Sequence, residues 1–212
     1  MANKPIPKDY LSLMTIIARI FNKISNIFNN LVYRSKIEYL GKESLIISPL
    51  KLHGTISIGS RTIVQYKSWI EANPLTKEDK AKIIIGSGCA IGHFNEIYAT
   101  KSIIIEDKVL TADRVYISDN LHGYNNPEIP IIDQPIKQIK PVRIGTGSWI
   151  GVGVAVIGAN IGKHCVIGSN AVVTKDIPDY SVAVGIPAKI IKRYNFQTQR
   201  WERTNSDGSF VK

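Results

Sequence analysis

The chain has 212 residues, of which 44% are hydrophobic and 21% charged, a composition that excludes a disordered tail protein and a multi-span membrane protein. Its formal net charge is +10, and the charge gathers at the ends, since residues 1–40 and residues 189–212 each carry six basic and two acidic side chains. The length predicts one domain, and the basic ends indicate an anionic partner near them.

The first predicted element is an amphipathic helix over residues 10–33. Its large apolar residues recur at spacings of three and four: Leu13, Met14, Ile17, Ile20, Phe21, Ile24, Ile27, Phe28 and Leu31. We expect this stripe to cap an open end of the fold. The alternative is contact with an anionic membrane surface, for which the sequence offers Lys4, Lys8, Arg19, Lys23, Arg34 and Lys36. No signal peptide and no uninterrupted run of 18 apolar residues is found, so we expect a cytoplasmic protein.

Three later stretches place a large aliphatic residue at every sixth position, mostly followed by a small residue. They begin at Ile85, Ile144 and Ile161. This spacing fits neither the two-residue period of a strand nor the 3.6-residue period of a helix. It fits short strands and tight turns repeated around a triangular coil, in which the aliphatic points inward and the small residue lets the backbone turn. Because one coil cannot bury its inner face alone, neighbouring coils must stabilise one another.

The repeat lapses between Ile117 and Ile144, where four prolines and a glycine cannot follow the coil. Residues 118–143 are therefore predicted to leave the coil as a loop and return to it. A long loop on a rigid scaffold is usually functional. A shorter break at residues 71–82, with alternating charges, is predicted to be a solvated insertion.

Of the four histidines, His122 stands out because it lies at the start of this loop. An imidazole titrates near neutral pH and can take a proton from a hydroxyl group. Asp119, three residues earlier, or a backbone carbonyl is expected to hold the ring tautomer. The two cysteines, Cys89 and Cys165, fall inside repeat units and are predicted to be packing thiols in a reducing compartment.

The loop and the last coils resemble those of a known family. The stretch from Ser118 to Tyr124 is similar to the loop of sugar O-acetyltransferases, and Gly185 to Lys189 is similar to their terminal coil. Over about residues 50–192, the chain resembles the hexapeptide-repeat acyltransferases, in particular the maltose, galactoside and polysaccharide acetyltransferases. The resemblance implies a mainly β fold, a left-handed parallel β-helix with an N-terminal amphipathic helix and an extruded active-site loop. We assign residues 1–45 to the helical segment, 46–192 to the β-helix and 193–212 to a basic tail.

The same resemblance implies direct transfer of an acetyl group from acetyl-coenzyme A to a sugar hydroxyl, with His122 as general base and Asp119 beside it. By motif match, eight residues would bind coenzyme A at the interfaces of a homotrimer: Trp149, Gly151, Ser169, Thr174, Lys175, Lys189, Lys192 and Arg193. Asn95, Tyr124 and Asn125 are candidates for contact with the sugar. No metal is expected.

Four other functions remain as alternatives. The β-helix could be a non-catalytic scaffold, or the enzyme could acetylate the nitrogen of an amino sugar. A zinc enzyme of the same fold is disfavoured because the histidines lack a closely spaced pair. Nucleic-acid binding is disfavoured because no groove-reading motif accompanies the charge. The favoured acceptor is a residue of a surface-polysaccharide precursor, in the cytoplasm or at the inner face of the membrane.

Overall fold

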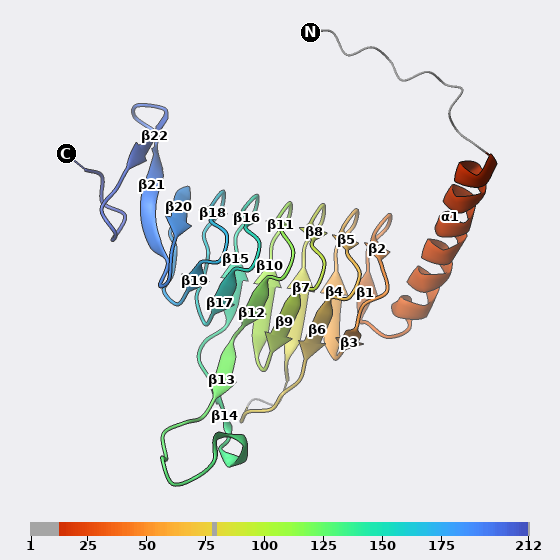
Figure 1. Cartoon of the computed structure of the whole chain (residues 1–212), viewed down its shortest axis with the longest axis horizontal. Helices are drawn as coiled ribbons and strands as arrows, with labels where there is room; N and C mark the ends of the chain where they lie inside the picture. The colour runs from red at the N-terminus through yellow and green to blue at the C-terminus, as the bar shows by residue number, and fades with distance from the viewer. Residues whose placement is uncertain (1–12, 78–79, 212) are drawn as a thin grey trace.

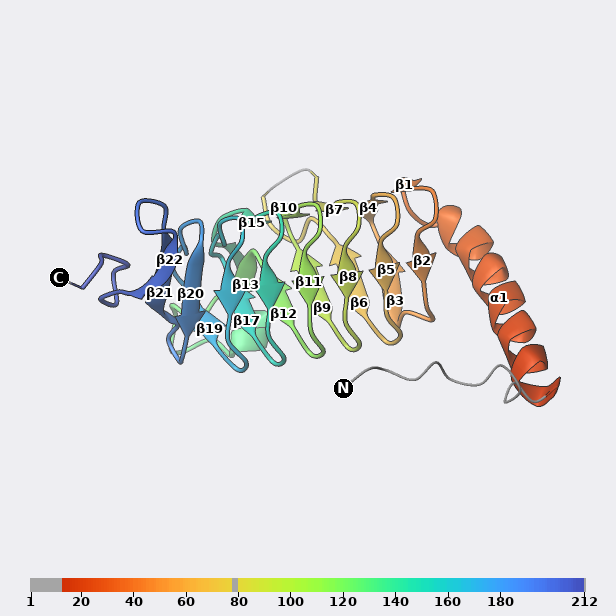
Figure 2. The same ribbon diagram turned by 90° about the horizontal axis from the view of Figure 1, so that it is seen from above.

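Three sheets of mainly parallel strands form the sides of a stacked coil in the computed structural model, which describes residues 13–77 and 80–211 (Figures 1 and 2). Sheet A contains β1 (Tyr39–Leu40), β4 (Thr55–Ile58), β7 (Lys82–Ile85), β10 (Ser102–Ile105) and β15 (Val142–Ile144). Sheet B contains β2 (Leu45–Ile46), β5 (Ile63–Val64), β8 (Ala90–Ile91), β11 (Leu110–Thr111), β16 (Trp149–Ile150), β18 (Val166–Ile167), β20 (Ser181–Val184), β21 (Lys189–Asn195) and β22 (Arg200–Arg203). Sheet C contains β3 (Lys51–His53), β6 (Trp69–Ala72), β9 (Glu96–Ala99), β12 (Tyr116–Ser118), β17 (Ala155–Ile157) and β19 (Val172–Val173). The predicted left-handed parallel β-helix is confirmed.

The core is a set of aliphatic columns that run along the coil axis. In sheet A, Ile58, Ile85, Ile105 and Ile144 follow one another in register and are at most 1% exposed. Equivalent columns run through sheets B and C, so each coil completes the burial of its neighbours. This is the stacking that the six-residue period predicts.

The small residue that follows each inward aliphatic is required for a reason other than the predicted one. Gly86, which follows the inward Ile85, does not turn the chain, and a Cβ atom added there would lie 2.7 Å from the backbone nitrogen of Asp107 in the next coil. The positive φ at this corner falls two residues later, at Gly88 (φ +67°). The small residue is therefore required for close approach between coils, and the turn is made after it.

A two-stranded ribbon and a short 3₁₀ turn make up the loop that leaves the coil. The ribbon pairs β13 (Asn120–His122) with β14 (Ile136–Gln138), and the 3₁₀ turn spans Ile131–Asp133. The loop projects away from the middle of the coil stack (Figure 1). Ile139 packs directly on Gly158 as the chain returns, where any side chain would collide with it. The predicted extrusion is confirmed.

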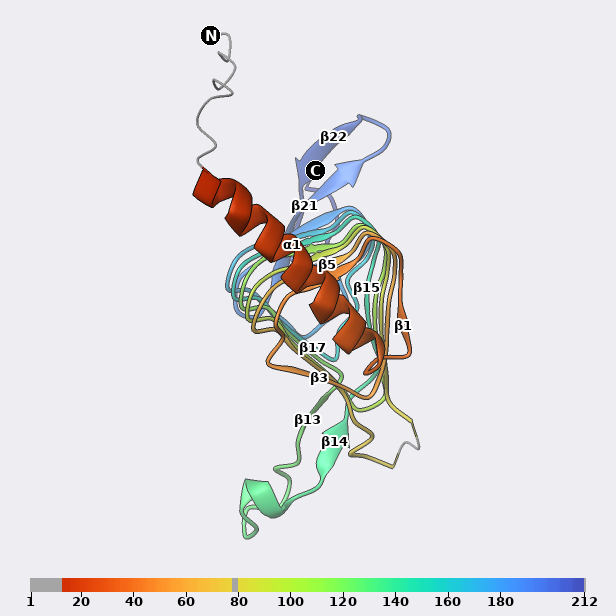
Figure 3. The same ribbon diagram turned by 90° about the vertical axis from the view of Figure 1, so that its right-hand side faces the viewer.

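Helix α1 (Leu13–Arg34) crosses the open end of the coil, but the predicted cap is wrong (Figure 3). Seven of its large apolar side chains are 42–66% exposed, namely Ile16, Ile17, Ile20, Ile24, Ile27, Phe28 and Leu31. Ile37 and Leu40, which follow the helix, are 8% exposed and close the end of the core instead. Positions 10–12 of the predicted helix, Lys4 and Lys8 lie outside the described residues. Within the described part of the chain, no helix is long and apolar enough to cross a membrane.

Both predicted domain boundaries also differ from the structure. The first coil strand begins at Tyr39 rather than after residue 45. The described part of the predicted tail, residues 193–211, is not free of the coil, because β21 and β22 extend sheet B as antiparallel strands. Buried Ile190 and an edge contact between the rings of Phe196 and Tyr180 (4.8 Å) attach this hairpin to the last coil.

Candidate active site

His122 is the last residue of β13 and lies opposite Ile136 of β14. It lines a hollow of about 350 Å³ whose floor is the outer face of sheet C. The other lining residues are Asn73, Leu75, Tyr98, Ala99, Thr100, Tyr116, Asn120, Leu121 and Ile136. In the described part of the chain, no side chain is hydrogen-bonded to the His122 imidazole, so its nitrogens are available to a ligand.

Asp119 has a structural position rather than the expected contact with His122. Its carboxylate is buried and accepts backbone N–H groups from Thr100, Lys101 and Ser102 of the preceding coil, each at 2.8 Å. It also accepts the Thr100 hydroxyl at 3.0 Å. These bonds fix the corner from which the loop departs. Neither Asp119 nor a described backbone carbonyl orients the imidazole in this structure.

The three candidates for sugar contact lie in different surroundings. Asn95 is fully buried, and its amide donates to the carbonyls of His93 (3.2 Å) and Ala112 (2.8 Å), so it is excluded from contact with a surface ligand. Tyr124 is 66% exposed on the loop. Asn125 lines a second hollow, described below. The sequence signal for Asn95 failed because its offset within the repeat turns its side chain into the coil.

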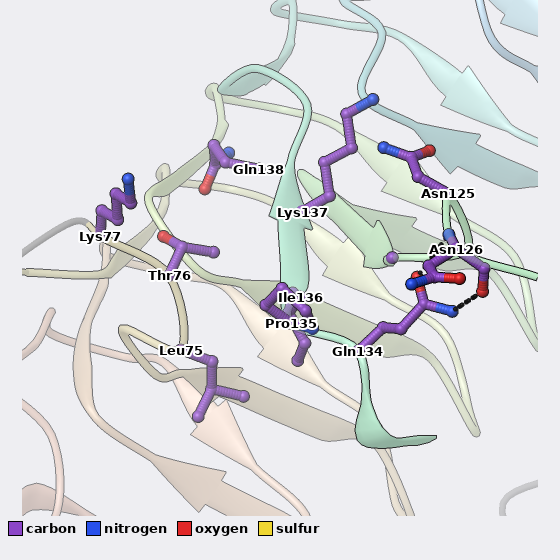
Figure 4. A pocket seen from close by; sticks show the side chains of 11 residues that line it. Leu75, Thr76, Lys77, Asn125, Asn126, Gln134, Pro135, Ile136, Lys137 and Gln138 are labelled. Carbon is purple, nitrogen blue, oxygen red and sulfur yellow. Dashed lines mark hydrogen bonds between the residues drawn. The ribbon is translucent and has the colours of Figure 1, made fainter. Parts of the chain in front are cut away.

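The second hollow, of about 610 Å³, lies between the extruded loop and the insertion that follows β6 (Figure 4). It shares Leu75 and Ile136 with the hollow of His122, so the two adjoin. Gln134 holds the loop together here, because its amide donates to the carbonyls of Asn126 and Ile129, each at 2.8 Å. The insertion predicted to be merely solvated therefore forms one wall of the candidate site.

A third hollow, of about 420 Å³, gathers Thr174, Lys175 and Lys189 from the predicted coenzyme A residues. It lies at the corner between sheets C and A, the same corner from which the loop departs. Asp176 lines it and accepts an ion-pair hydrogen bond from Lys140 of the returning loop at 2.6 Å. The loop and this hollow are therefore directly connected.

The remaining predicted coenzyme A residues lie elsewhere on the coil. Trp149 is 50% exposed on the outer face of sheet B, the side opposite that corner, whereas Gly151 and Ser169 lie at the corner between sheets B and C. Lys192 and Arg193 belong to β21, and Arg193 donates to the carbonyl of Gly208 at 3.5 Å. A single chain therefore does not bring the eight residues together.

An apolar row runs along the outer face of sheet B, and sequence reasoning missed it. Strand pairing aligns its members from coil to coil: Leu45, Ile63, Ala90, Leu110, Trp149, Val166 and Val182. Ile63, Leu110 and Trp149 are exposed. In the sequence, this row occupies the position just before each inward-pointing aliphatic residue, and that spacing is the signal that could have revealed it.

Sequence reasoning also missed a polar cluster beside the His122 hollow. Burial raises the pKa of Glu71, but hydrogen bonds from Lys51 (2.8 Å) and the Trp69 indole (2.9 Å) outweigh it, and the pKa falls below its ordinary value. Burial and the neighbouring Glu71 carboxylate raise the pKa of Tyr98 to about 12. Tyr98, which lines the hollow, therefore keeps its phenol proton at neutral pH.

Both thiols are buried and free, and neither lines one of the three hollows. Cys89 Sγ lies 3.0 Å from the carbonyl of Glu106, and Cys165 Sγ lies 3.1 Å from that of Pro178. Burial raises the pKa of Cys165 to about 11 and that of Cys89 above its ordinary value. The prediction that they pack the coil wall is confirmed.

Among the described residues, no three His, Cys, Asp or Glu side chains converge as a metal site would require.

Comparison with known proteins identifies relatives by sequence. Over 144 residues the chain is 40% identical to the Mycobacterium tuberculosis protein named acetyltransferase Rv3034c, a match that covers 68% of this chain and 47% of the relative. Over 129 residues it is 35% identical to the Escherichia coli protein named lipopolysaccharide biosynthesis O-acetyl transferase WbbJ, covering 57% of this chain and 65% of the relative. Both names assign the activity provisionally. The chain spans about half to two thirds of the length of these relatives. No family model matches the sequence.

Solved structures share the fold. AntD, an N-acyltransferase from Bacillus cereus crystallised with dTDP and 3-hydroxybutyryl-CoA, superposes with a TM-score of 0.65 at 20% identity, over 80% of this chain and 90% of that one. At this identity the likeness concerns the fold alone.

Proposed function

We propose, from the place of this chain among the hexapeptide-repeat acyltransferases, that it transfers an acetyl group from acetyl-coenzyme A to a sugar hydroxyl. The observation that carries the proposal is the position of His122. It is the imidazole of the ejected loop, it faces a hollow, and it is free of protein partners within the described residues. A histidine with a structural role would be expected to form hydrogen bonds to the coil.

The proposed chemistry is a single displacement. His122 takes the proton of the sugar hydroxyl while that oxygen forms a bond to the thioester carbonyl carbon. The carbon–sulfur bond then breaks, and coenzyme A leaves with its thiol protonated from the imidazolium. A positioned general base of this kind contributes about 10²–10⁴ to the rate. Asp119 acts in this proposal by holding the root of the loop.

Acetyl-coenzyme A is proposed to lie along the corner between sheets C and A. The hollow of Thr174, Lys175 and Lys189 supplies two cations for phosphate groups. The ion pair between Lys140 and Asp176 places that hollow next to the returning loop, which supports a path for the cofactor toward His122.

A homotrimer is proposed because Trp149 and the corner hollow face opposite sides of one chain. If sheet B of one copy faced the corner of the next, Trp149 and the apolar row would contribute to the neighbour's site. Burial of that row would also give the copies a reason to associate. Native mass measurement tests this arrangement: three copies are expected, and a monomer would contradict it.

The acceptor is proposed to be a sugar of a surface-polysaccharide precursor, as the name of the Escherichia coli relative indicates for that protein. The buried, free thiols suit the reducing cytoplasm as the place of action. The alternative acceptor is the nitrogen of an amino sugar; AntD, which shares the fold, is named an N-acyltransferase. Product analysis separates the ester from the amide.

The test is thiol release from acetyl-coenzyme A with a panel of neutral sugars, amino sugars, nucleotide sugars and glycan extracts. Acceptor-dependent release that falls at least about 100-fold in His122→Ala would support the proposal. His93→Ala is the matched control, because His93 pairs with Asp113 outside the hollows and should change the rate little. Equal release by wild type and His122→Ala would overturn the role of the loop, and a chain that binds no coenzyme A would favour a scaffold.

A further inference from the structure

We propose that the exposed apolar face of α1 lies in the surface of a membrane that contains anionic lipid. The seven side chains of this face run from Ile16 to Leu31 and are 42–66% exposed. At 100° per residue they fall within one third of the helix circumference, so they form a single continuous stripe. Fifteen residue steps at 1.5 Å give this stripe a length of about 22 Å.

The side of the helix that contacts the coil differs from the side that carries the stripe. Asn30 donates from Nδ2 to the carbonyl of Ser44 at 2.7 Å and accepts the N–H of Ile46 at 3.2 Å through Oδ1. Tyr33 packs against the core. Helical spacing places both residues well away from the centre of the stripe. The contact with the coil therefore turns the stripe away from the coil, where the described residues of this chain leave it uncovered.

The charged residues of α1 favour anionic lipid as the partner of the apolar stripe. The charged residues of Leu13–Arg34 are Arg19, Lys23 and Arg34, and the helix contains no acidic residue. Lys36 follows it. A single apolar stripe bordered by cations and without acids is the composition of a helix that lies in an anionic lipid interface. A helix that pairs with a second copy would be expected to carry acids opposite these cations.

The stripe is also distinct from the surface proposed for assembly. The apolar row from Leu45 to Val182 runs along sheet B and carries no residue of α1. A trimer built on that row does not require the helix, which is therefore free for another partner. Membrane contact would bring the acetyltransferase to an acceptor that is itself held at the membrane.

The experiment is co-sedimentation of the full chain with vesicles of phosphatidylcholine alone and of phosphatidylcholine with one quarter phosphatidylglycerol. We expect binding to the anionic vesicles that weakens as salt is raised. Ile24→Glu should reduce the bound fraction at least about tenfold, because it places a charge in the centre of the stripe. Ser25→Glu is the matched control: it adds the same charge at the next residue, about 100° further around the helix and outside the stripe of seven side chains, and should retain most of the binding.

Three results would overturn the proposal. The wild-type chain could remain in the supernatant with anionic vesicles, or Ile24→Glu and Ser25→Glu could bind alike. Ile24→Glu could also change the native mass of the assembly without changing vesicle binding, in which case the stripe would be an interface between copies. Thermal unfolding of both variants checks that the coil is intact. None of these readouts depends on acetyl transfer, so the proposed enzyme activity can hold or fail separately.

Discussion

Along the walls of the β-helix, each aliphatic side chain packs on an equivalent one in the neighbouring coils. The extruded loop is held at its root by polar contacts instead, and it leaves His122 without a hydrogen-bonding side chain among the described residues. The wall column through Ile85 and Ile105 is repeated from coil to coil. The loop root depends on one carboxylate, Asp119, which accepts three backbone N–H groups of the preceding coil. Under the proposed function, stability depends on the walls and chemistry on the loop, and substitutions can separate the two.

The largest effect on stability is expected in the wall. Ile97→Ala removes a fully buried side chain from the middle of a sheet C column and should lower the free energy of unfolding by about 2–5 kcal/mol. Ile97→Val, the milder control, should cost about 0.5–1.5 kcal/mol. Denaturant unfolding measures both. Equal and small losses would contradict tight stacking in the wall.

At the loop root, Asp119→Asn should lower the free energy of unfolding by about 1–3 kcal/mol, because the new amide group faces two backbone N–H donors. Since the carboxylate does not touch His122, the rate per folded molecule should stay within about tenfold of wild type when assayed at low temperature. A loss as large as that of His122→Ala would instead restore Asp119 as the partner of the imidazole.

The sequence predicts the walls well and the side-chain partners poorly. The six-residue period depends on local spacing, and it therefore identifies the coils, the inward aliphatics and the break at the loop. The partners of Asp119 lie 17–19 residues earlier in the chain, one coil away. Asn95 is a different case, because its offset within the repeat turns its side chain into the coil. The exposure of the α1 stripe could not be predicted because the contacts of Asn30 with Ser44 and Ile46, 14 and 16 residues later, decide which side of the helix meets the coil.

Acid should weaken the polar cluster beside the His122 hollow. The pKa of Glu71 is lowered in the folded chain, so its pairing stabilises the fold above the ordinary glutamate value and is lost as the pH falls through the lowered pKa. We expect wild type to lose part of its unfolding free energy below about pH 4.5, the ordinary value, and Glu71→Gln to lose less over that range. Parallel pH curves for the two proteins would contradict this.

The smallest functional effect is expected at the thiols. Burial raises the pKa of Cys165 to about 11, so at pH 8 the native protein should react with a disulfide reagent at least about 100-fold more slowly than the unfolded chain. Cys165→Ala should leave acetyl transfer within about twofold of wild type after correction for the folded fraction. Rapid modification coupled to loss of activity would indicate a thiol in the chemistry.

The most direct test of the separation between wall and loop is to measure acetyl transfer and unfolding free energy together for His122→Ala. Because His122 is hydrogen-bonded to no described side chain, the unfolding free energy should change by no more than about 0.5 kcal/mol. The transfer rate should fall at least about 100-fold. A variant that keeps its activity, or one that loses activity only in proportion to its folded fraction, would contradict the assignment of the chemistry to this loop.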